Sequence, residues 1–448
     1  MTLKLAVVGG GWAGMAAAMS VTVFEAAREL GGRARALQAT RPDGVPVRLD
    51  NGQHILIGAY RQALECMQQA GVPLSESLLS LPLGLPFPDG TGLQTPGWAA
   101  RWPATPALLA AIVAAPGWCW SDRLSMVRAA VRWQRLGFAC APSDTVSRLC
   151  GGLTDRVMTE LIEPLCVSAL NLPTGQASGQ VFLRVMRDAL LGDGFGEWRA
   201  SSLLLPRTDL GSLFPESAAR WLAGSQGSRF RLCLGTRVTG LRPRERGWHL
   251  LGNDVDDPFD QVIWATPAPS ASQVMRQVAD EAAIDGIQPW ARSLGTWADA
   301  CGGLAYTAIT TVYTWSPGLR LPRPMLALRN GPGAPAQFVL AFVVSASQGD
   351  RDTLEHAVLR QAREQRGAGG LQPILTVVEK RATFACTPDL ARPGSQLAPG
   401  LQAAGDYLEG PYPATLEAAV RAGVAAGAQV RALAGRGTAG LGLAQPPV

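Results

Sequence analysis

The sequence of 448 residues is poor in metal-binding side chains and in long apolar runs, and each shortage excludes a class of protein. It has three histidines, and none of its eight cysteines forms a CxxC pair, so no metal ligand is predicted. The cysteines are interpreted as small apolar groups in a reducing compartment. No apolar run reaches the ~18 residues of a transmembrane helix, and the N-terminus leads into a strand without a secretory signal.

Charge is also scarce. Charged residues make up 17% of the chain, and the net charge of +5 is scattered, so a nucleic-acid partner is not expected. The apolar content of 47% excludes a disordered protein. The length exceeds one ordinary core and predicts two or three packed domains.

The turn after the first strand has the glycine spacing of a dinucleotide-binding site. Gly9, Gly11 and Gly14 satisfy GxGxxG between a strand and a helix-prone, alanine-rich stretch. They predict a tight turn, close approach of the backbone to a pyrophosphate, and close packing of helix on strand. Trp12 and Ala13 lie in the same turn, where the free N–H groups of the helix start can bind phosphate.

Glu25 closes the second predicted strand and is the candidate acceptor for ribose hydroxyl groups. An acid there repels a 2′-phosphate, which favours FAD or NAD over NADP. A second glycine pair with an arginine, Gly32 and Arg33 among them, resembles the extended motif of the flavin-dependent amine oxidase and carotenoid desaturase superfamily. That resemblance implies that both lie along the cofactor, with Arg33 as the charge partner; the alternative for Arg33 is an exposed arginine.

Longer blocks narrow the resemblance to the squalene-associated FAD-dependent desaturases, understood as hydroxysqualene dehydroxylases of bacterial hopanoid and squalene biosynthesis. The similarity extends over most of the chain. Its most specific parts are "LDNGQH", at residues 49–54, and "AGDYLEGPYPATLE", at residues 404–417.

By this resemblance the second of these blocks is a flavin-binding motif, and FAD is the cofactor. Gly405 and Asp406 would lie near the ribityl phosphate, and Thr415 and Leu416 would start a helix that points its N-terminus at the flavin. Val238 matches a strand position whose backbone contacts adenine in the superfamily. The alternative for Asp406 is a simple turn or capping residue.

The implied fold is α/β, with a Rossmann-like FAD-binding domain of the glutathione-reductase type and an inserted mixed α+β substrate domain. The FAD-binding domain is assigned to residues 1–70, 200–270 and 390–448. The substrate-binding domain is assigned to residues 71–199, which are mainly helical, and 271–389.

The crossover in the first unit is short. Only 16 positions separate Gly9 from Glu25, against ~20 or more in most such units. Family members have about seven more residues here, close to two turns at 3.6 residues each. The FAD site is therefore predicted to be recognisable but strained or weakened, with a helix from about Trp12 to Ser20; a sequence defect in this stretch is the alternative.

The resemblance implies FAD-dependent reductive dehydroxylation of hydroxysqualene to squalene. Protonation of an allylic alcohol releases water, and hydride from reduced flavin meets the developing cation. This needs one acid, exclusion of water and an apolar slot, which the helical insert is expected to line. The implied partners are a lipophilic isoprenoid and other enzymes of squalene biosynthesis.

Four residues in the family-like blocks are candidates for catalysis: Asp50, His54, Arg207 and Asp209. His54 could deliver a proton or bind a backbone carbonyl, which is the commoner role of a lone histidine. For Arg207 an electrostatic role is favoured.

Two other functions stay open. A carotenoid-type (phytoene) desaturase or an amine oxidase would oxidise its substrate, and an amine oxidase needs an aromatic pair beside the flavin that five tyrosines do not identify. A flavin-free relative that binds a polyisoprenoid or a partner enzyme would follow if the short unit has lost its cofactor.

Tryptophans surround an apolar stretch at residues 106–120: Trp98, Trp102, Trp118 and Trp120. They favour either a buried helix with core tryptophans, which is slightly preferred, or a surface helix at a membrane interface. The expected location is the cytoplasm, and the second interpretation adds peripheral contact with the inner face of the bacterial membrane.

Overall fold

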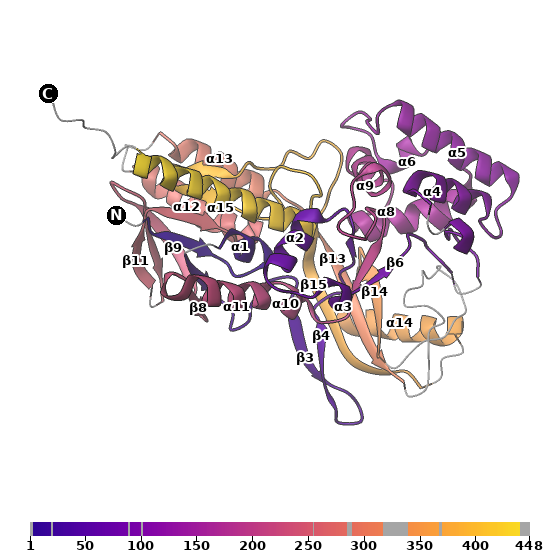
Figure 1. Ribbon diagram of the computed structural model, residues 1–448, viewed down its shortest axis with the longest axis horizontal. Coiled ribbons are helices and arrows are strands. Elements are labelled where there is room, and N and C mark those ends of the chain that lie inside the picture. Colours follow the sequence, from indigo (N-terminus) through magenta and orange to yellow (C-terminus); the bar gives the residue numbers. More distant parts are fainter. Residues whose placement is uncertain are drawn as a thin grey trace.

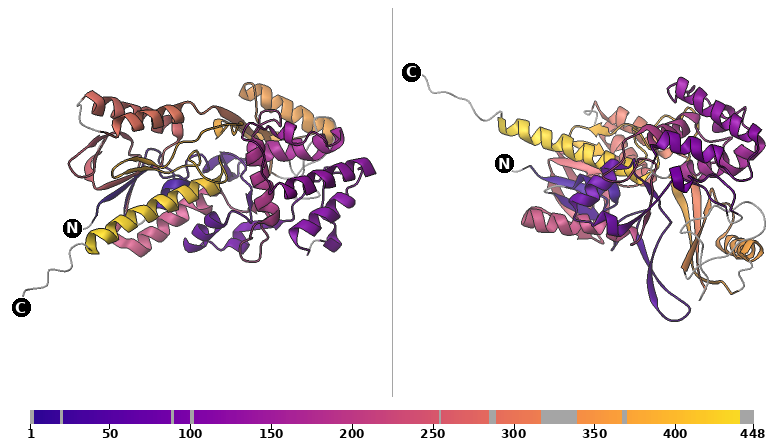
Figure 2. Two further views of the ribbon diagram at one scale, coloured as in Figure 1. Left: turned by 90° about the horizontal axis from the view of Figure 1, so that it is seen from above. Right: turned by 45° about the vertical axis from the view of Figure 1, so that its right-hand side comes forward.

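The computed structural model describes residues 3–18, 21–87, 90–99, 102–253, 255–284, 289–316, 339–366 and 370–439. A parallel sheet with its covering helices occupies one end of the molecule (Figure 1). Helices α4 to α9 lie at the other end, beside the long strands β13 to β15, and the two turned views keep this arrangement (Figure 2). The α/β fold with an N-terminal nucleotide-binding unit is confirmed.

The main sheet has six strands in the order β16-β17-β12-β1-β2-β8. Its strands come from the start, the middle and the end of the chain: β1 (Leu5–Val8), β2 (Thr22–Glu25), β8 (Arg231–Leu234), β12 (Gln261–Trp264), β16 (Gln396–Ala398) and β17 (Leu401–Ala403). All neighbouring pairs are parallel except β16 with β17. Because the carboxyl ends of parallel strands meet at one edge, this sheet opens a ligand site there.

The core lies on both faces of this sheet. Along β1, Leu5 and Val7 face a core made with α1 and the C-terminal helix, whereas Ala6 and Val8 face the other core. Such alternation is the strand period of two. The face of Leu5 and Val7 is covered by α1 (Trp12–Ala17), α2 (Arg61–Gln69), α10 (Leu210–Leu213), α11 (Pro215–Gln226) and α15 (Leu416–Ala439). The opposite face is covered by α12 (Ala268–Ile284) and α13 (Ala291–Gly302).

The structure also describes four smaller sheets. A meander covers one face of the main sheet: β9 (Val238–Pro243), β10 (Trp248–Gly252) and β11 (Val255–Phe259). The other small sheets pair β3 (Ala36–Thr40) with β4 (Pro46–Asp50); β5 (Leu56–Ile57), β7 (Leu203–Pro206) and β6 (Leu78–Leu81); and β14 (Val339–Ser345), β13 (Tyr306–Trp315) and β15 (Gln372–Phe384).

The predicted helical segment forms as expected between β6 and β7. Its elements are α4 (Ala104–Val113), α5 (Trp120–Arg135), α6 (Val146–Leu149), α7 (Asp155–Val157), a π-helical turn η2 (Met158–Ile162), α8 (Glu163–Leu170) and α9 (Gly179–Leu191). The 3-10 turn η1 (Gly97–Ala99) also lies between β6 and β7. Outside this segment are α3 (Leu74–Ser77), the 3-10 turn η3 (Gly227–Arg229) and the 16-residue helix α14 (Arg351–Arg366). No helix among the described residues has the length and apolar character needed to cross a bilayer.

The preferred interpretation of the tryptophan-flanked stretch is wrong. Only Trp118 is in the core, with 4% of its surface exposed, whereas Trp98, Trp102 and Trp120 are 63%, 43% and 73% exposed. Helix α4 buries one face only, because its alanines and Ile112 pack inward while its larger leucine and valine side chains include exposed ones. The stretch is therefore a surface helix with exposed tryptophans beside it.

The short crossover still closes a parallel pair. Helix α1 ends at Ala17, earlier than the predicted Ser20, and the backbone of Ala18 is already extended. Six residues span only ~9 Å of helix, which is shorter than the strand that the crossover has to pass. The register pairs Ala6 with Thr22 and Val8 with Phe24. Residues 19 and 20, where the predicted strain would concentrate, lie outside the described residues.

We expect insertion of seven helix-forming residues after Ser20 to raise the melting temperature or the fraction of protein that carries flavin. Two more turns would let helix span the length of the strand. Thermal unfolding and flavin absorbance measure the two effects. The same insertion after Gly44, in the exposed β3–β4 turn where nothing lies near the glycine, is the control. No gain at Ser20 beyond the control would mean that the short crossover is fully competent.

Candidate functional site

The glycine turn has open space where a pyrophosphate would lie. Gly9 has a φ of +113°, which favours glycine, and a methyl group on Gly14 would meet the carbonyl oxygen of Gly9 at 1.8 Å. These two glycines are needed by the fold itself. By contrast, a methyl group on Gly11 would meet nothing nearer than 3.9 Å, and one on Gly32 nothing nearer than 3.6 Å. The two glycine faces thus leave room for a ligand against the backbone, as FAD requires.

Trp12 and Ala13 belong to the protein side of this turn. The indole of Trp12 is buried and donates to the carbonyl of Ala34 at 3.2 Å. Ala13 lies under α15, since a methyl group on Gly423 would meet its carbonyl oxygen at 2.1 Å. Only the backbone atoms of these two residues can face a nucleotide. Helix α1 has six residues, which is too short for its dipole to be evidence of a phosphate site.

Glu25 is held in place by the same turn. One carboxylate oxygen accepts the N–H of Gly10 at 2.7 Å, and the other accepts that of Ala27 at 2.7 Å. Each oxygen keeps a lone pair for a ribose hydroxyl. The N–H of Thr236 donates to the Glu25 carbonyl at 2.9 Å, which brings the start of β9, with the buried Val238, to this end of the sheet.

Arg33 joins three distant segments. Its guanidinium donates to the Asp406 carboxylate at 2.5 Å and to the carbonyl of Ala382 on β15 at 2.9 Å. Its own carbonyl accepts the side-chain amide of Asn51 at 2.8 Å. Arg33 is therefore not a free surface arginine, and Asp406 is an ion-pair partner rather than a simple turn residue.

The C-terminal motif starts its helix as the resemblance implied. The Thr415 hydroxyl donates to the Tyr412 carbonyl at 2.6 Å and accepts the N–H of Ala418 at 3.2 Å, and α15 begins at Leu416. Gly405 is a glycine because a methyl group there would meet the ring of Tyr407 at 2.4 Å. The C-terminal motif thus contains both the ion-pair partner of Arg33, which is Asp406, and the capped N-terminus of α15.

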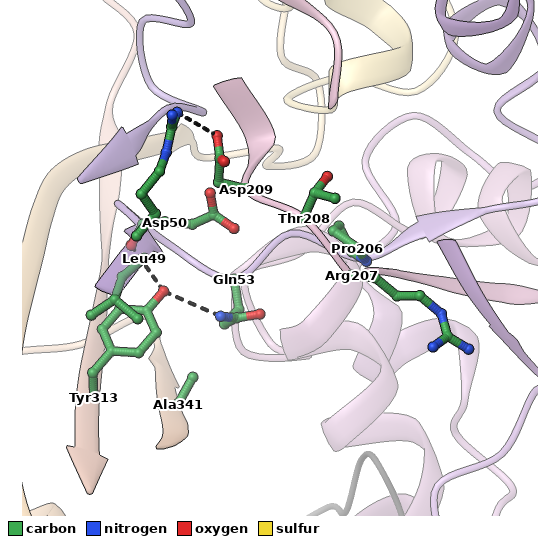
Figure 3. Close-up of a pocket in the computed structure, with 10 residues that line it drawn as sticks. Leu49, Asp50, Gln53, Pro206, Arg207, Thr208, Asp209, Tyr313 and Ala341 are labelled. Carbon is green, nitrogen blue, oxygen red and sulfur yellow. Dashed lines mark hydrogen bonds and ion pairs between the residues drawn. The ribbon is translucent and has the colours of Figure 1, made fainter. Parts of the chain in front are cut away.

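A separate cavity of about 390 Å³ lies between β4, β7 and the long strands β13 and β14 (Figure 3). Its lining is Arg48, Leu49, Asp50, Gln53, Pro206, Arg207, Thr208, Asp209, Tyr313 and Ala341. None of these residues comes from 71–199, so the helical insert does not line this cavity. The reason is topological: β13 and β14 bring the second inserted segment against the DNGQH block. That the insert lines the substrate slot stays a prediction.

Asp50 is the buried acid of this cavity. One of its oxygens accepts the N–H of Leu210 at 2.8 Å. Burial is the main cause that raises its pKa to about 6, and the charge of Asp209 adds to it, whereas the Leu210 N–H and the charge of Arg48 oppose it. A carboxyl group of this kind is largely protonated below pH 6 and can act as an acid.

Asp209 and Arg48 form the polar neighbour of Asp50. Asp209 caps α10 through the N–H of Ser212 at 2.9 Å and pairs with Arg48 at 3.0 Å. Arg48 also contacts Glu216 at 3.0 Å. Asp209 is thus bound by an ion-pair partner and by the N–H of Ser212, while the adjacent Asp50 is the protonatable member.

Tyr313 fixes the backbone of the acid. Its hydroxyl donates to the Asp50 carbonyl at 2.8 Å and accepts the Gln53 side-chain amide at 3.2 Å. Burial raises the pKa of Tyr313 to about 12, so it remains a donor at neutral pH. Neither Tyr313 nor Arg48 was a sequence candidate; strand alternation could have marked Tyr313 as inward-facing, but not as a neighbour of Asp50.

The other two candidates lie apart from this carboxyl pair. The His54 ring contacts the Gly52 carbonyl through Nδ1 at 2.8 Å, and burial lowers its pKa, which fits the structural role of a neutral histidine. Arg207 is exposed and its N–H donates to the Ser77 carbonyl at 2.8 Å. Figure 3 shows its side chain pointing away from Asp50 and Asp209.

We expect Gly11→Ala to leave folding intact and to lower FAD affinity by about tenfold or more, since roughly 1.4 kcal/mol of lost contact is one decade. The new methyl group would occupy the open face toward Gly32. Flavin absorbance after dialysis against graded FAD, together with the melting temperature, checks this. Gly224→Ala, on α11 where nothing lies near the glycine, is the matched control. Unchanged FAD affinity in Gly11→Ala would contradict the assignment of this turn to the pyrophosphate.

Comparison with known proteins agrees with this geometry. The chain is 29% identical to a hydroxysqualene dehydroxylase of Rhodopseudomonas palustris, with 94% of this chain and 97% of that protein covered. It is 24% identical to a hydroxysqualene dehydroxylase of Sinorhizobium fredii, over 94% and 97%. The resemblance inferred from the DNGQH and AGD blocks is confirmed.

The fold has relatives among solved structures. A putative protoporphyrinogen oxidase from Exiguobacterium sp. superposes with a TM-score of 0.62 at 17% identity, covering 97% of this chain and 99% of that one. At this identity the likeness concerns the fold alone. The family description for flavin containing amine oxidoreductases matches residues 13–295. The chain therefore belongs to the flavin-containing amine oxidoreductase family, and its cofactor is FAD.

Proposed function

We propose that this FAD-dependent oxidoreductase removes the hydroxyl group of hydroxysqualene and releases squalene. The names of the two relatives support this substrate. The structural observation that carries the proposal is Asp50, a buried acid with a pKa of about 6 in a cavity at the DNGQH block. Loss of water from an allylic alcohol requires such a proton donor.

FAD, when bound in its reduced form, supplies the hydride. Gly11, Gly32 and Glu25 would hold its nucleotide half, and the Arg33–Asp406 pair would border the C-terminal motif. The protein's own part is acid chemistry: protonated Asp50 gives its proton to the hydroxyl oxygen, the C–O bond breaks, and water leaves. The carbon that loses water is reduced and FAD is oxidised, so the electrons balance.

The neighbours of Asp50 have positioning roles. Tyr313 and Gln53 hold the Asp50 backbone, and Asp209 keeps the Asp50 pKa high by its charge. Arg48 pairs with Asp209 at 3.0 Å, and its charge opposes the rise in the pKa of Asp50. The buried Asp50 is therefore the candidate acid, and Asp209 acts on it through its charge.

A tyrosine pair near the C-terminal motif is a candidate for the aromatic pair that an amine oxidase needs, and its two rings touch each other. Tyr60 and Tyr412 lie by the C-terminal motif with ring centroids 5.8 Å apart and planes at 66°. Rings in edge contact leave no gap between them for an amine. The remaining partners proposed are other enzymes of squalene biosynthesis, which must supply the C30 alcohol and consume the polyene.

The decisive assay incubates the purified flavoprotein with hydroxysqualene and reduced flavin under anaerobic conditions. We expect squalene, detected by mass spectrometry, with reoxidation of the flavin in equal amount. Reduction of oxidised flavin by a polyene or an amine, without squalene formation, would instead favour the desaturase or amine oxidase. A colourless protein that takes up no added FAD would favour the flavin-free relative.

We expect Asp50→Asn to lower turnover by about 10²- to 10⁴-fold, the usual contribution of a general acid. In the wild type, activity should fall as the pH rises through about 6, because the protonated form of Asp50 is then lost. Folding raises this pKa, so ionised Asp50 costs stability above pH 6 and the neutral asparagine should not lower the melting temperature at pH 7.5. Initial rates across pH and thermal unfolding measure both effects.

Asp209→Asn is the matched control. It loses the ion pair with Arg48 and weakens the cap of α10, so the melting temperature should fall while the acid remains. Removing this charge should also move the pH limit of activity to lower pH, because Asp209 helps to raise the pKa of Asp50. An Asp50→Asn enzyme with wild-type rate and pH profile would exclude Asp50 as the acid.

A further inference from the structure

Helices α4 and α5 lie at the end of the molecule far from the main sheet (Figure 1). Both helices expose apolar side chains. Helix α5 presents Trp120, Leu124, Arg128, Val131 and Arg135 to solvent. Their spacing of four, four, three and four residues follows one side of a helix. The exposed side of this helix thus combines large apolar groups with arginines, whereas its buried residues include Met126 and Trp133.

The neighbouring helix has a second apolar stripe. Leu109 and Val113 of α4 are exposed and one turn apart. Trp98 and Trp102, which precede α4, contact each other with ring centroids 5.0 Å apart and are both exposed. Exposed tryptophan and leucine in this number are unusual on a protein surface that meets only water.

The charge on this surface has one sign. Residues 104–135, which form α4, α5 and the turn between them, contain four arginines, no lysine and one acid, Asp122, a balance of 4 − 1 = +3. The Asp122 carboxylate is buried and accepts the N–H of Cys119 at 2.9 Å and the hydroxyl of Thr154 at 2.6 Å. The adjoining α7 adds one acid and one base, Asp155 and Arg156, and leaves the sign unchanged.

One arginine is already arranged beside a tryptophan. The guanidinium of Arg123 lies 5.1 Å from the ring centroid of Trp120. Arginine on a long stem can keep its charge at the headgroup level while the neighbouring ring enters the acyl boundary. Tryptophan beside arginine therefore suits the interface between water and an anionic lipid layer.

We propose that the exposed surface of α4 and α5, with Trp98 and Trp102, docks the protein on a bilayer that contains anionic lipids. The apolar stripes supply insertion, and the arginines supply attraction to the headgroups. The proposal does not depend on the reaction, because binding to vesicles requires neither substrate nor flavin chemistry. It differs from a membrane span, since these helices lie on the surface of the protein core.

Sedimentation of the full-length flavoprotein with vesicles of phosphatidylcholine, with and without phosphatidylglycerol, tests the proposal. We expect binding that strengthens with phosphatidylglycerol and weakens at high salt. The double variant Trp120→Ser with Leu124→Ser should lose about tenfold or more in vesicle affinity, because two apolar side chains no longer leave water. Trp221→Ser, on α11 in the nucleotide-binding part and 39% exposed, should bind as wild type.

Two further measurements keep the outcome interpretable. Thermal unfolding shows whether the double variant is folded; if it is not, Leu124→Ser alone, which leaves the Arg123–Trp120 contact in place, takes its role. Analytical ultracentrifugation without vesicles shows whether the surface pairs two copies of the chain. Equal vesicle binding by the double variant and wild type, no binding by either, or dimerisation that the double variant abolishes, would each overturn the proposal.

Discussion

The ion pair between Arg33 and Asp406 is the contact on which the arrangement of the cofactor region depends. It links the segment after the first β-α-β unit to the C-terminal motif, and the same guanidinium bonds to the carbonyl of Ala382 on β15. Ala382 and Asp406 both meet the Arg33 side chain, although more than 300 residues of chain separate each of them from Arg33. Arginine suits this task because its planar fork donates in several directions at once. A lysine would supply the charge but not the simultaneous contacts.

A second constraint fixes the C-terminal helix against the N-terminal part. Glu417 is fully buried and accepts the N–H groups of Gln62 and Ala63 at the start of α2, at 3.3 and 2.9 Å. Burial raises the pKa of Glu417, while these N–H groups and Arg421 lower it. The motif that begins α15 thus stabilises α2 directly after the DNGQH block. Cofactor motif and acid-bearing block are held together by the protein before any substrate arrives.

Local sequence predicted the parts of the site that depend on backbone conformation. The glycine turn, Glu25 and the start of α15 at Leu416 follow from short motifs because each needs particular residue types at fixed spacing. Contacts between distant strands were not predictable in this way. Tyr313 reaches Asp50 only because β13 pairs beside β15. The exposure of the tryptophans was left open between a buried and a surface helix, since an alanine-rich helix gives almost the same pattern whether one face or both are covered.

Helix α1 has only six residues, and its length limits how small this β-α-β unit is. The glycine turn and Glu25 keep their mutual hydrogen bond across this short crossover. Their separation is therefore set by strand pairing in the sheet, and by the close approach of Gly423 on α15 to Ala13, more than by helix length. For protein engineers, the length of this helix becomes a dimension to vary: the sheet and its packing helix fix where the turn and Glu25 lie, and the number of helical turns between them is expected to tune how firmly the unit holds together.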